Sequence, residues 1–283
     1  MTFLKIDWAP DEIFLSLGPI QIYWYSIMFI LAFSLGYYII QKIYINDGKP
    51  VELVEPLFIY IVLGTLIGAR LGEVFFYNWE YFQNNLIEIF LPIKKEPNSS
   101  LLFGMIDGFK FVGYRGLASH GAAIGIVSSV FIYKYKFNYD SILWIFDRIV
   151  IPISIGGMFV RIGNFFNSEI VGKYTESNFG VVFLNNQEIY PRHPAQLYEG
   201  FGYLILFIVL WKLYWNTDFK NQKGFLFGLF FTGLFSIRFL VEFVKESQGG
   251  FEDVLGVIST GQWLSIPFIL IGIFFMIRSK KSA

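Results

Sequence analysis

Residues 142–172 read ILWIFDRIVIPISIGGMFVRIGNFFNSEIVG, an apolar run of membrane-spanning character that ends in a polar cluster. The cluster begins at Arg161 and adds two amides and a carboxylate by Glu169. A charged side chain near the hydrocarbon boundary is costly unless it meets an anion, a cavity or the interface. Ionisable groups in such positions usually mark a substrate path, so we expect the cluster to be functional.

The composition places the whole chain in a membrane. Of its 283 residues, 55% are hydrophobic and 20% are aromatic, and the formal net charge is zero. This is too apolar for an ordinary soluble domain. Apolar stretches of about 18 residues or more recur, and because lipid offers backbone groups no partners they should be helices. We therefore predict an all-α polytopic membrane protein with one transmembrane domain over residues 1–283.

The hydropathy pattern predicts about seven transmembrane helices. The predicted spans are 19–40, 54–77, 117–134, 142–160, 197–215, 224–243 and 259–278. The third and fourth are short, and Asp147 and Arg148 in the fourth need partners inside the bundle. Six or eight helices are the alternatives. The segments 78–116 and 173–192 should form small ordered caps over the outer leaflet.

The distribution of Lys and Arg predicts the orientation. One side receives Lys42, Lys49, Lys134, Lys136, Lys212, Lys220, Lys223, Arg278, Lys280 and Lys281. That side should be the cytoplasm, which leaves the N-terminus outside and the C-terminus inside. The N-terminus lacks a basic flank and its first apolar run is long, so we expect a retained anchor and no cleaved signal.

Several chemistries have no sequence support. The chain contains no cysteine, which excludes disulfides, thiolate metal sites and a cysteine nucleophile. The motifs HExxH and GxSxG are absent, and aspartyl chemistry would need a second aspartate to face Asp147. With only two histidines, we expect no metal and no cofactor. The dispersed lysines argue against a nucleic-acid partner.

Polar residues of the predicted helices converge at one depth toward the outer leaflet. They are Tyr25, Arg70, His120, Arg161, Gln196, Tyr198, Glu199, Arg238, Glu242 and Gln262. A site at this depth could hold an anionic headgroup. The alternative for Arg70 is neutralisation by Glu73, one helical turn away. Arg238 and Glu242 offer the same alternative.

The histidines and a glycine repeat have separate interpretations. His120 could act as a general acid or base or contact a headgroup, because imidazole changes charge near neutral pH; a structural role is the alternative. His193 precedes a helix and is interpreted as structural. Gly64, Gly68 and Gly72, at intervals of four, are interpreted as positions of close helix packing.

Seven segments of the sequence, taken in order, match the pattern of one protein family. One of them is VRIGNFFNSEIVG at residues 160–172. The others are GPIQIYWY, GARLGEVFFYN, SHGAAIG, RHPAQLYE, RFLVEFVK and GQWLSIP. A single RxGN would be a weak match, but the combined match in this order is highly specific. The chain resembles the prolipoprotein diacylglyceryl transferase family, whose signature is similar to residues 160–172.

The resemblance implies an enzyme of the bacterial inner membrane with seven helices and an outward N-terminus. It would move the diacylglyceryl group of phosphatidylglycerol to the thiol of the lipobox cysteine of a preprolipoprotein, which forms a thioether and releases glycerol phosphate. The signature positions carried over are Arg161, Asn164, Asn167, Glu169 and Gly172. The other matching positions are Tyr25, Arg70, His120, Arg238 and Glu242, with Gln196, Tyr198 and Gln262 of less defined role.

The implied chemistry suggests roles for these residues. Arg161 and Arg238, each able to give two parallel hydrogen bonds, would bind the phosphate and stabilise its charge. A thiol with a pKa of about 8.5 is only partly ionised at neutral pH, so a nearby base would raise the nucleophilic fraction. His120 is the candidate base, and Glu169 or Glu242 is the alternative.

Four positions depart from the family pattern. Val160 and Ala122 replace glycines, and these small changes should leave the backbone approach intact. Leu234 stands where a tyrosine is expected, so that any hydroxyl role is lost or supplied elsewhere. Lys245 replaces an arginine; it keeps the charge and loses the planar geometry that suits phosphate. We expect the cluster at Arg161 to carry more of the headgroup binding as a result.

The alternative function is transport of a lipid or small anion, because convergent arginines also suit translocation. Transporters often show related halves with broken helices at mid-bilayer, whereas no internal repeat is visible in this sequence. A purely structural scaffold would not need so many costly polar groups at one depth. These comparisons favour the enzyme.

Overall fold

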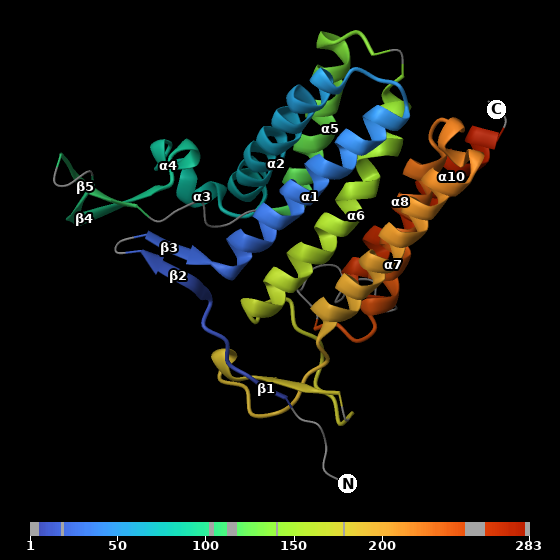
Figure 1. Cartoon of the computed structure of the whole chain (residues 1–283). Coiled ribbons are helices and arrows are strands. Elements are labelled where there is room, and N and C mark those ends of the chain that lie inside the picture. Colours follow the sequence, from blue (N-terminus) through green and yellow to red (C-terminus); the bar gives the residue numbers. More distant parts are fainter. Residues whose placement is uncertain are drawn as a thin grey trace. The chain divides into compact units, whose positions relative to one another are not determined.

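The structure is a computed structural model that describes residues 6–17, 20–101, 105–111, 118–139, 141–177, 179–246 and 258–280. The chain divides into two compact units. The first consists of Met1–Gly48 with Leu143–Ala283, and the second of Lys49–Ile142. Figure 1 shows that long helices make up most of both units.

The described residues contain seven helices of 17 residues or more, one for each predicted span. They are α1 (Trp24–Asn46), α2 (Val54–Phe76), α5 (Ser119–Lys136), α6 (Ile142–Phe166), α7 (Ala195–Asn216), α8 (Phe225–Val241) and α10 (Thr260–Lys280). Five of them, α1, α2, α6, α7 and α10, are long and apolar enough to cross a membrane, and α8 is a shorter apolar helix. The prediction of an all-α polytopic membrane fold is confirmed.

Three helix boundaries differ from the prediction by five or six residues, and one of them is the end of the first helix, which lies at Asn46 and not at residue 40. The first helix begins at Trp24 and not at residue 19, because strand β3 (Ile20–Tyr23) pairs antiparallel with β2 (Ile13–Leu17). The fourth helix was expected to end at residue 160, but α6 continues to Phe166. The first residues of the polar cluster therefore belong to the last turns of α6. Within these turns Arg161 donates a hydrogen bond to the side chain of Asn164.

The five helices of the first unit, α1, α6, α7, α8 and α10, lie side by side (Figure 1). Small residues allow the close contacts: Gly157 of α6 faces the ring of Tyr203 of α7, and Gly228 of α8 faces Gly272 of α10. Close backbone approach through small residues is the usual means of packing in membranes, where lipid is as apolar as the helices.

A buried polar network joins four helices near the start of α6. Arg148 donates to Asp47 after the end of α1 (Nε–Oδ2 2.8 Å), and Tyr214 of α7 donates to the other oxygen of Asp47 (2.7 Å). Asp147 accepts hydrogen bonds from the backbone of Gly224 and of the first turn of α8, at 2.6 and 2.8 Å. Both charges therefore have the bundle partners that were predicted for them.

An ordered cap follows α6 in the first unit. Strand β1 (Ile6–Trp8) pairs in parallel with β6 (Val181–Phe183), and Leu184–Asn186 forms a 3-10 turn. The indole of Trp8 donates to the carbonyl of Phe165 at 2.9 Å, and Phe165 packs with Val181 and Phe183. The N-terminal strand thus holds the cap against the end of α6.

Helices α2 and α5 pack closely in the second unit. A Cβ atom at Gly68 would overlap the carbonyl oxygen of Gly121 and come within 2.8 Å of the Cα of Gly125. Gly64 and Gly72 meet the same helix at similar distances. The interpretation of the glycine repeat as a packing surface is confirmed.

The outer part of the second unit contains α3 (Trp79–Phe82), α4 (Ile87–Phe90) and the antiparallel strands β4 (Ile93–Leu101) and β5 (Ile106–Phe111). Phe82 and Ile89 pack on Val74 of α2. The buried carboxylate of Glu88 accepts a hydrogen bond from Tyr81 (2.7 Å), which raises the pKa of Tyr81 to about 12. Residues 102–104 and 112–117 of this predicted cap lie outside the described residues.

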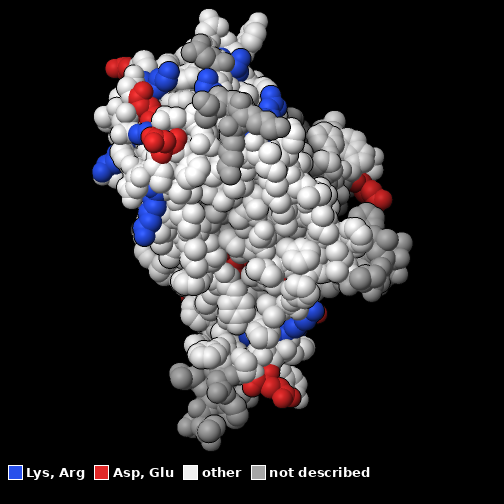
Figure 2. Space-filling view, turned by 90° about the vertical axis from the view of Figure 1, so that its right-hand side faces the viewer, with Lys and Arg blue, Asp and Glu red and all other residues white. Residues whose placement is uncertain are grey.

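The surface of the first unit agrees with a lipid environment. Figure 2 shows the face that carries α8 and α10, where charged side chains are sparse in the middle and gather toward the ends. Large apolar side chains of α10 are exposed at Leu264, Leu270, Phe274 and Ile277. Exposed apolar helices with charges at their ends are expected of membrane spans.

Candidate functional site: a buried ionic cluster

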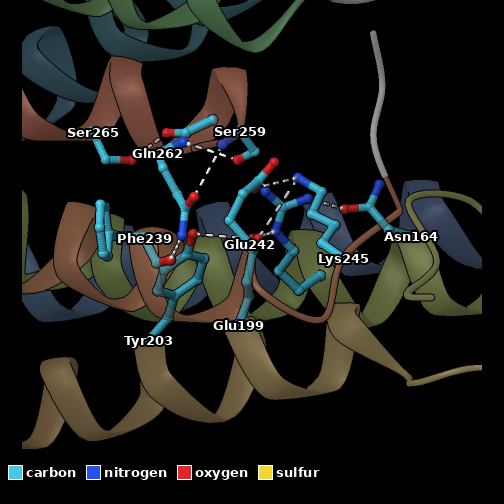
Figure 3. Close-up of polar contacts among 11 residues, drawn as sticks. Asn164, Glu199, Tyr203, Phe239, Glu242, Lys245, Ser259, Gln262 and Ser265 are labelled. Carbon is cyan, nitrogen blue, oxygen red and sulfur yellow. Dashed lines mark hydrogen bonds and ion pairs between the residues drawn. The ribbon is translucent and has the colours of Figure 1, made fainter. Parts of the chain in front are cut away.

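Arg161 belongs to an ionic cluster buried between α6, α7 and the residues after α8. Figure 3 shows its neighbours Asn164 and Glu199. The Nε of Arg161 lies 2.5 Å from Glu199 Oε2, and its Nη1 donates to Asn164 Oδ1 at 2.9 Å. The side chains of Arg161 and Glu199 are 11% and 2% exposed. A charge so deeply buried requires a partner, since an unpaired ion in a low dielectric is strongly destabilised.

Glu199 of α7 connects three elements, although from the sequence it had no assigned role. Besides Arg161, its Oε2 accepts a hydrogen bond from Tyr203, one turn along α7, at 3.2 Å. Its Oε1 lies 3.9 Å from Lys245 Nζ and has no hydrogen-bond partner among the described residues. Glu199 is therefore the shared anion of the cluster.

Lys245 is buried between two carboxylates. Its side chain is 5% exposed, and Nζ lies 3.9 Å from Glu199 and 3.7 Å from Glu242. Both distances exceed hydrogen-bonding range, so the ammonium is held by charge. Figure 3 shows Glu199, Glu242 and Lys245 converging from α7 and from the end of α8.

Gly172 of the signature fixes the backbone beside Lys245. The two residues form an isolated antiparallel bridge, and the N–H of Gly172 donates to the carbonyl of His193 at 2.9 Å. A Cβ atom at Gly172 would lie 2.5 Å from that carbonyl oxygen and 2.7 Å from that of Val244. Only glycine fits this position, which explains its place in the signature.

Glu169 lies in the loop after α6 and is held by amides. Its Oε1 accepts from Asn164 Nδ2 at 2.7 Å and from Asn167 Nδ2 at 3.4 Å, and Gln196 donates to its carbonyl at 2.6 Å. The next residue, Ile170, has φ of +57°. A left-handed β-branched residue is strained, by about 1–3 kcal/mol, and such strain gathers at functional sites.

Arg238, in the last turns of α8, differs from the other cations of the cluster. Within the part of the chain that the structure describes, it forms no ion pair, whereas Glu242 pairs with Lys245. It lies close enough to act electrostatically on Glu199 and Lys245. No ion pair joins Arg238 to Glu242 among the described residues. Gln262 of α10 adjoins this region and donates to the carbonyl of Phe239 at 3.4 Å.

The two predicted tyrosines lie at different places. Tyr25, in the first turn of α1, packs on Gly163 of α6, where a Cβ atom would lie 2.6 Å from the tyrosine ring. Tyr25 thus adjoins the cluster. Tyr198, which is half-exposed, lies with its hydroxyl 3.2 Å from Nδ1 of His193, outside the ion pairs.

Arg70 and His120 belong to the second unit. Arg70 donates through Nε to the carbonyl of Ile89 (3.0 Å) and through Nη2 to that of Glu88 (2.5 Å), at the end of α4. It also lies over the ring of Phe82, 4.7 Å from the centroid. These contacts hold α3 and α4 on α2. His120 is exposed in the first turn of α5 and has no hydrogen-bond partner among the described residues.

A second ionic network lies in the cap. Arg192 donates to Glu188 (2.9 Å), Glu246 (2.7 Å) and the carbonyl of Gly172 (3.1 Å), and lies over the ring of Tyr174 at 3.8 Å. Burial raises the pKa of Glu188, but hydrogen bonds from Arg192 and Tyr174 outweigh it and hold that pKa below its ordinary value. The network ties the signature loop to the segment after α8.

The charges of the buried cluster favour an anionic ligand. Three cations, Arg161, Arg238 and Lys245, meet two carboxylates, Glu199 and Glu242. The carboxylate of Glu169, linked to Arg161 through Asn164, offsets the third cation, so the feature that favours an anion is Arg238, which forms no ion pair among the described residues. The described residues contain no group of three or more His, Asp or Glu that could hold a metal ion.

These features define a multi-pass helical membrane protein with a buried ionic cluster between α6, α7 and the residues after α8. A model of the prolipoprotein diacylglyceryl transferase family matches residues 12–278. The chain belongs to that family.

Relatives match the chain over nearly its whole length. It is 40% identical over 274 residues to the phosphatidylglycerol–prolipoprotein diacylglyceryl transferase of Tolumonas auensis, with 97% of each chain covered. It is 41% identical over 283 residues to the protein of that name from Bacteroides fragilis, covering 99% of this chain and 98% of the relative. The relative from Chloroherpeton thalassium is 39% identical over 282 residues, covering 100% and 96%.

Proposed function

We propose that the chain transfers the diacylglyceryl group of phosphatidylglycerol to the thiol of the lipobox cysteine of a preprolipoprotein. The sulfur attacks the glyceryl carbon; the C–S bond forms as the C–O bond to phosphate breaks, glycerol phosphate leaves, and a base takes the thiol proton. The names of the relatives support this donor and this class of acceptor. The observation that carries the proposal is Arg238, which acts on the buried carboxylate of Glu199 and forms no ion pair among the described residues.

Arg238 is the principal phosphate ligand in this proposal. It is the cation of the cluster without an ion pair among the described residues, so both edges of its guanidinium can meet phosphate oxygens. Arg161 has committed Nε and Nη1 to Glu199 and Asn164, and it contributes its charge. Cations held in place before the reaction stabilise the charge that develops on the leaving phosphate.

His120 is the proposed acceptor of the thiol proton. Its imidazole has no hydrogen-bond partner among the described residues, whereas Glu242 is occupied by Lys245 and Glu169 by two amides. Histidine is the side chain that most often serves as a general base in enzymes. The proposed substrate-binding residues are Tyr25, Arg70, Asn164, Asn167, Glu169, Gly172, Gln196, Tyr198 and Glu242.

The same proposal places the chain in the bacterial inner membrane as a single transferase domain. The N-terminus would be periplasmic and the C-terminus cytoplasmic. The lysines and arginines in the loops between the predicted spans support this orientation, because they gather on the side assigned to the cytoplasm. The cap that follows α6 would then face the periplasm, where a secreted preprolipoprotein presents its cysteine.

Reconstitution of the purified chain with phosphatidylglycerol and a lipobox peptide tests the function. The expected result is a mass gain of one diacylglyceryl group on the cysteine, and none on a matched peptide with serine at that position. Arg238→Lys should lose most of the activity of the wild type, because a point charge replaces a two-pronged contact. Lipid movement across the vesicle without any peptide modification would favour the transporter and refute the transferase.

A further inference from the structure

Lys245 occupies the place that the ammonium of a lipid headgroup would take. We propose that Lys245 selects the donor lipid by excluding headgroups that carry a primary ammonium, so that a neutral polyol headgroup such as glycerol is accepted and ethanolamine is rejected. The proposal rests on the function proposed above. It specifies which headgroup that site takes.

The position of Lys245 carries this inference. Its ammonium lies between two buried carboxylates, 3.9 Å from Glu199 Oε1 and 3.7 Å from Glu242 Oε2. The three side chains are 5%, 2% and 8% exposed, so water screens them little. Two buried carboxylates that both lie within 4 Å of one point could bind an ammonium ion. In this chain the ammonium of Lys245 already occupies that point.

A lysine side chain and an ethanolamine headgroup end in the same group, a primary ammonium on a methylene carbon. An incoming ethanolamine would therefore compete with Lys245 for the same carboxylates. It would also meet the positive charges of Arg161 and Arg238, which already act on Lys245. Like charges placed in contact are a strong form of discrimination between ligands.

A glycerol headgroup avoids this conflict. It carries no charge, and its hydroxyls can donate hydrogen bonds. Glu199 Oε1 is buried and has no hydrogen-bond partner in the described part of the chain. A hydroxyl at this oxygen would satisfy an acceptor that is otherwise costly to bury.

The backbone keeps Lys245 from moving aside. Lys245 is bridged to Gly172, and the adjacent Val244 accepts a hydrogen bond from the N–H of Lys173 at 2.7 Å. The following residue, Glu246, pairs with Arg192 of the cap at 2.7 Å. The backbone on both sides of Lys245 is therefore fixed, and its ammonium stays close to the two carboxylates. The ammonium of a lipid headgroup would have to enter from the bilayer and displace it.

The selection can be measured without ambiguity, because the transferred group is the same for both donors. Phosphatidylglycerol and phosphatidylethanolamine with matched acyl chains give the same modified peptide and differ only in the leaving phosphomonoester. The ratio of the two transfer rates therefore reports headgroup selection alone. It also cancels any general loss of activity in a variant.

Three substitutions test the role of the charge. Lys245→Met removes the ammonium at similar length, Lys245→Gln removes the charge and keeps a hydrogen-bond donor, and Lys245→Arg keeps the charge. We expect the ethanolamine-to-glycerol rate ratio to rise about tenfold or more in the Met and Gln variants, since the competing cation is gone. The Arg variant should keep the wild-type ratio.

The outcomes separate the two proposals. Transfer by the wild type from phosphatidylglycerol, with an unchanged ratio in both neutral variants, overturns the selection by Lys245 and leaves the transferase intact. Absence of transfer by the wild type overturns the function itself. A thermal-shift comparison of phosphoethanolamine with glycerol phosphate gives an activity-independent result: the neutral variants should gain stabilisation by phosphoethanolamine relative to the wild type, and no gain contradicts the proposal.

Discussion

Replacement of Glu199 by glutamine should destabilise the fold more than any other single polar change in the cluster. Glu199→Gln preserves the shape of the side chain and removes the anion that Arg161 and Lys245 share, at 2.5 and 3.9 Å. Removing one partner of a buried ion pair leaves an uncompensated charge and costs about 3–5 kcal/mol. We expect a loss of this size in the free energy of unfolding.

Tyr203→Phe is the matched control. It removes one hydrogen bond of 3.2 Å to the same carboxylate and leaves every charge in place. A hydrogen bond of this kind contributes about 0.5–1.5 kcal/mol, or somewhat more when one partner is charged. The two variants therefore differ mainly in the charge of Glu199, and the difference between them measures the ion pair.

Denaturant unfolding in detergent micelles, followed by circular dichroism, gives the free energies, and the peptide assay gives the transfer rates. A double-mutant cycle adds the single variants Arg161→Met and Glu199→Met and the double variant Arg161→Met/Glu199→Met. The double variant should unfold at a higher denaturant concentration than either single methionine variant, because no buried charge is left alone. Equal unfolding midpoints for Glu199→Gln and Tyr203→Phe would refute the reasoning.

Three other predictions concern packing, helix capping and pH. Gly68→Ala should cost about 1–3 kcal/mol, because the added methyl overlaps the backbone of α5, whereas Gly156→Ala, with its nearest neighbour 3.7 Å away, should not destabilise. Asp147→Asn should lower the unfolding free energy by about 0.5–2 kcal/mol through the weakened cap of α8, and exposed Asp218→Asn should not change it. Glu188 has a lowered pKa in the fold, so its stabilisation is complete above its unfolded pKa of about 4.3 and is lost as pH falls through the lower folded value. The unfolding midpoints of wild type and Glu188→Gln, measured against pH, should therefore converge in acid, and a constant difference contradicts this.

The helices were predictable from the sequence because lipid imposes a simple rule of length and hydropathy. The strands were not. Strand β1 pairs with β6, which is far away in the sequence. The indole of Trp8 in β1 donates a hydrogen bond to the carbonyl of Phe165, 157 positions away. Short pairings of this kind depend on tertiary contacts that local patterns do not encode. The start of the first helix at Trp24 was also missed, because the preceding strand, Ile20–Tyr23, is itself largely apolar.

The candidate site was predictable in part. Arg161, Asn164 and Glu169 were predicted from the signature, and their side chains form one chain of hydrogen bonds. Glu199 had a detectable signal, since it ends the matched segment RHPAQLYE and lies at the same depth. No signal in the sequence marked Tyr203, which lies one turn after Glu199 in α7. A tyrosine in an apolar helix cannot be told from a packing residue by sequence alone. A pairing partner on another helix becomes visible only when the helices are placed side by side.

The hydroxyl that Leu234 cannot supply has a counterpart in the cluster. The sequence left open whether a hydroxyl role on α8 is lost or supplied elsewhere. Tyr203 of α7 places a buried hydroxyl on the carboxylate of Glu199, at 3.2 Å. The cluster therefore contains a tyrosine hydroxyl from a neighbouring helix, bound to the same anion that holds Arg161.

The contacts of Arg161 bear on how Arg161 and Arg238 would share the binding of a phosphate. A guanidinium makes a two-pronged contact through two neighbouring nitrogens, either Nε with Nη2 or Nη1 with Nη2. In Arg161, Nε is engaged by Glu199 and one of the two N–H groups of Nη1 by Asn164. A two-pronged phosphate contact through Nε and Nη2 would require the contact with Glu199 to break, whereas Arg238 forms no ion pair among the described residues. We therefore propose that Arg161 holds α7 and the Glu169 loop in place and that Arg238 makes the two-pronged contact with the phosphate.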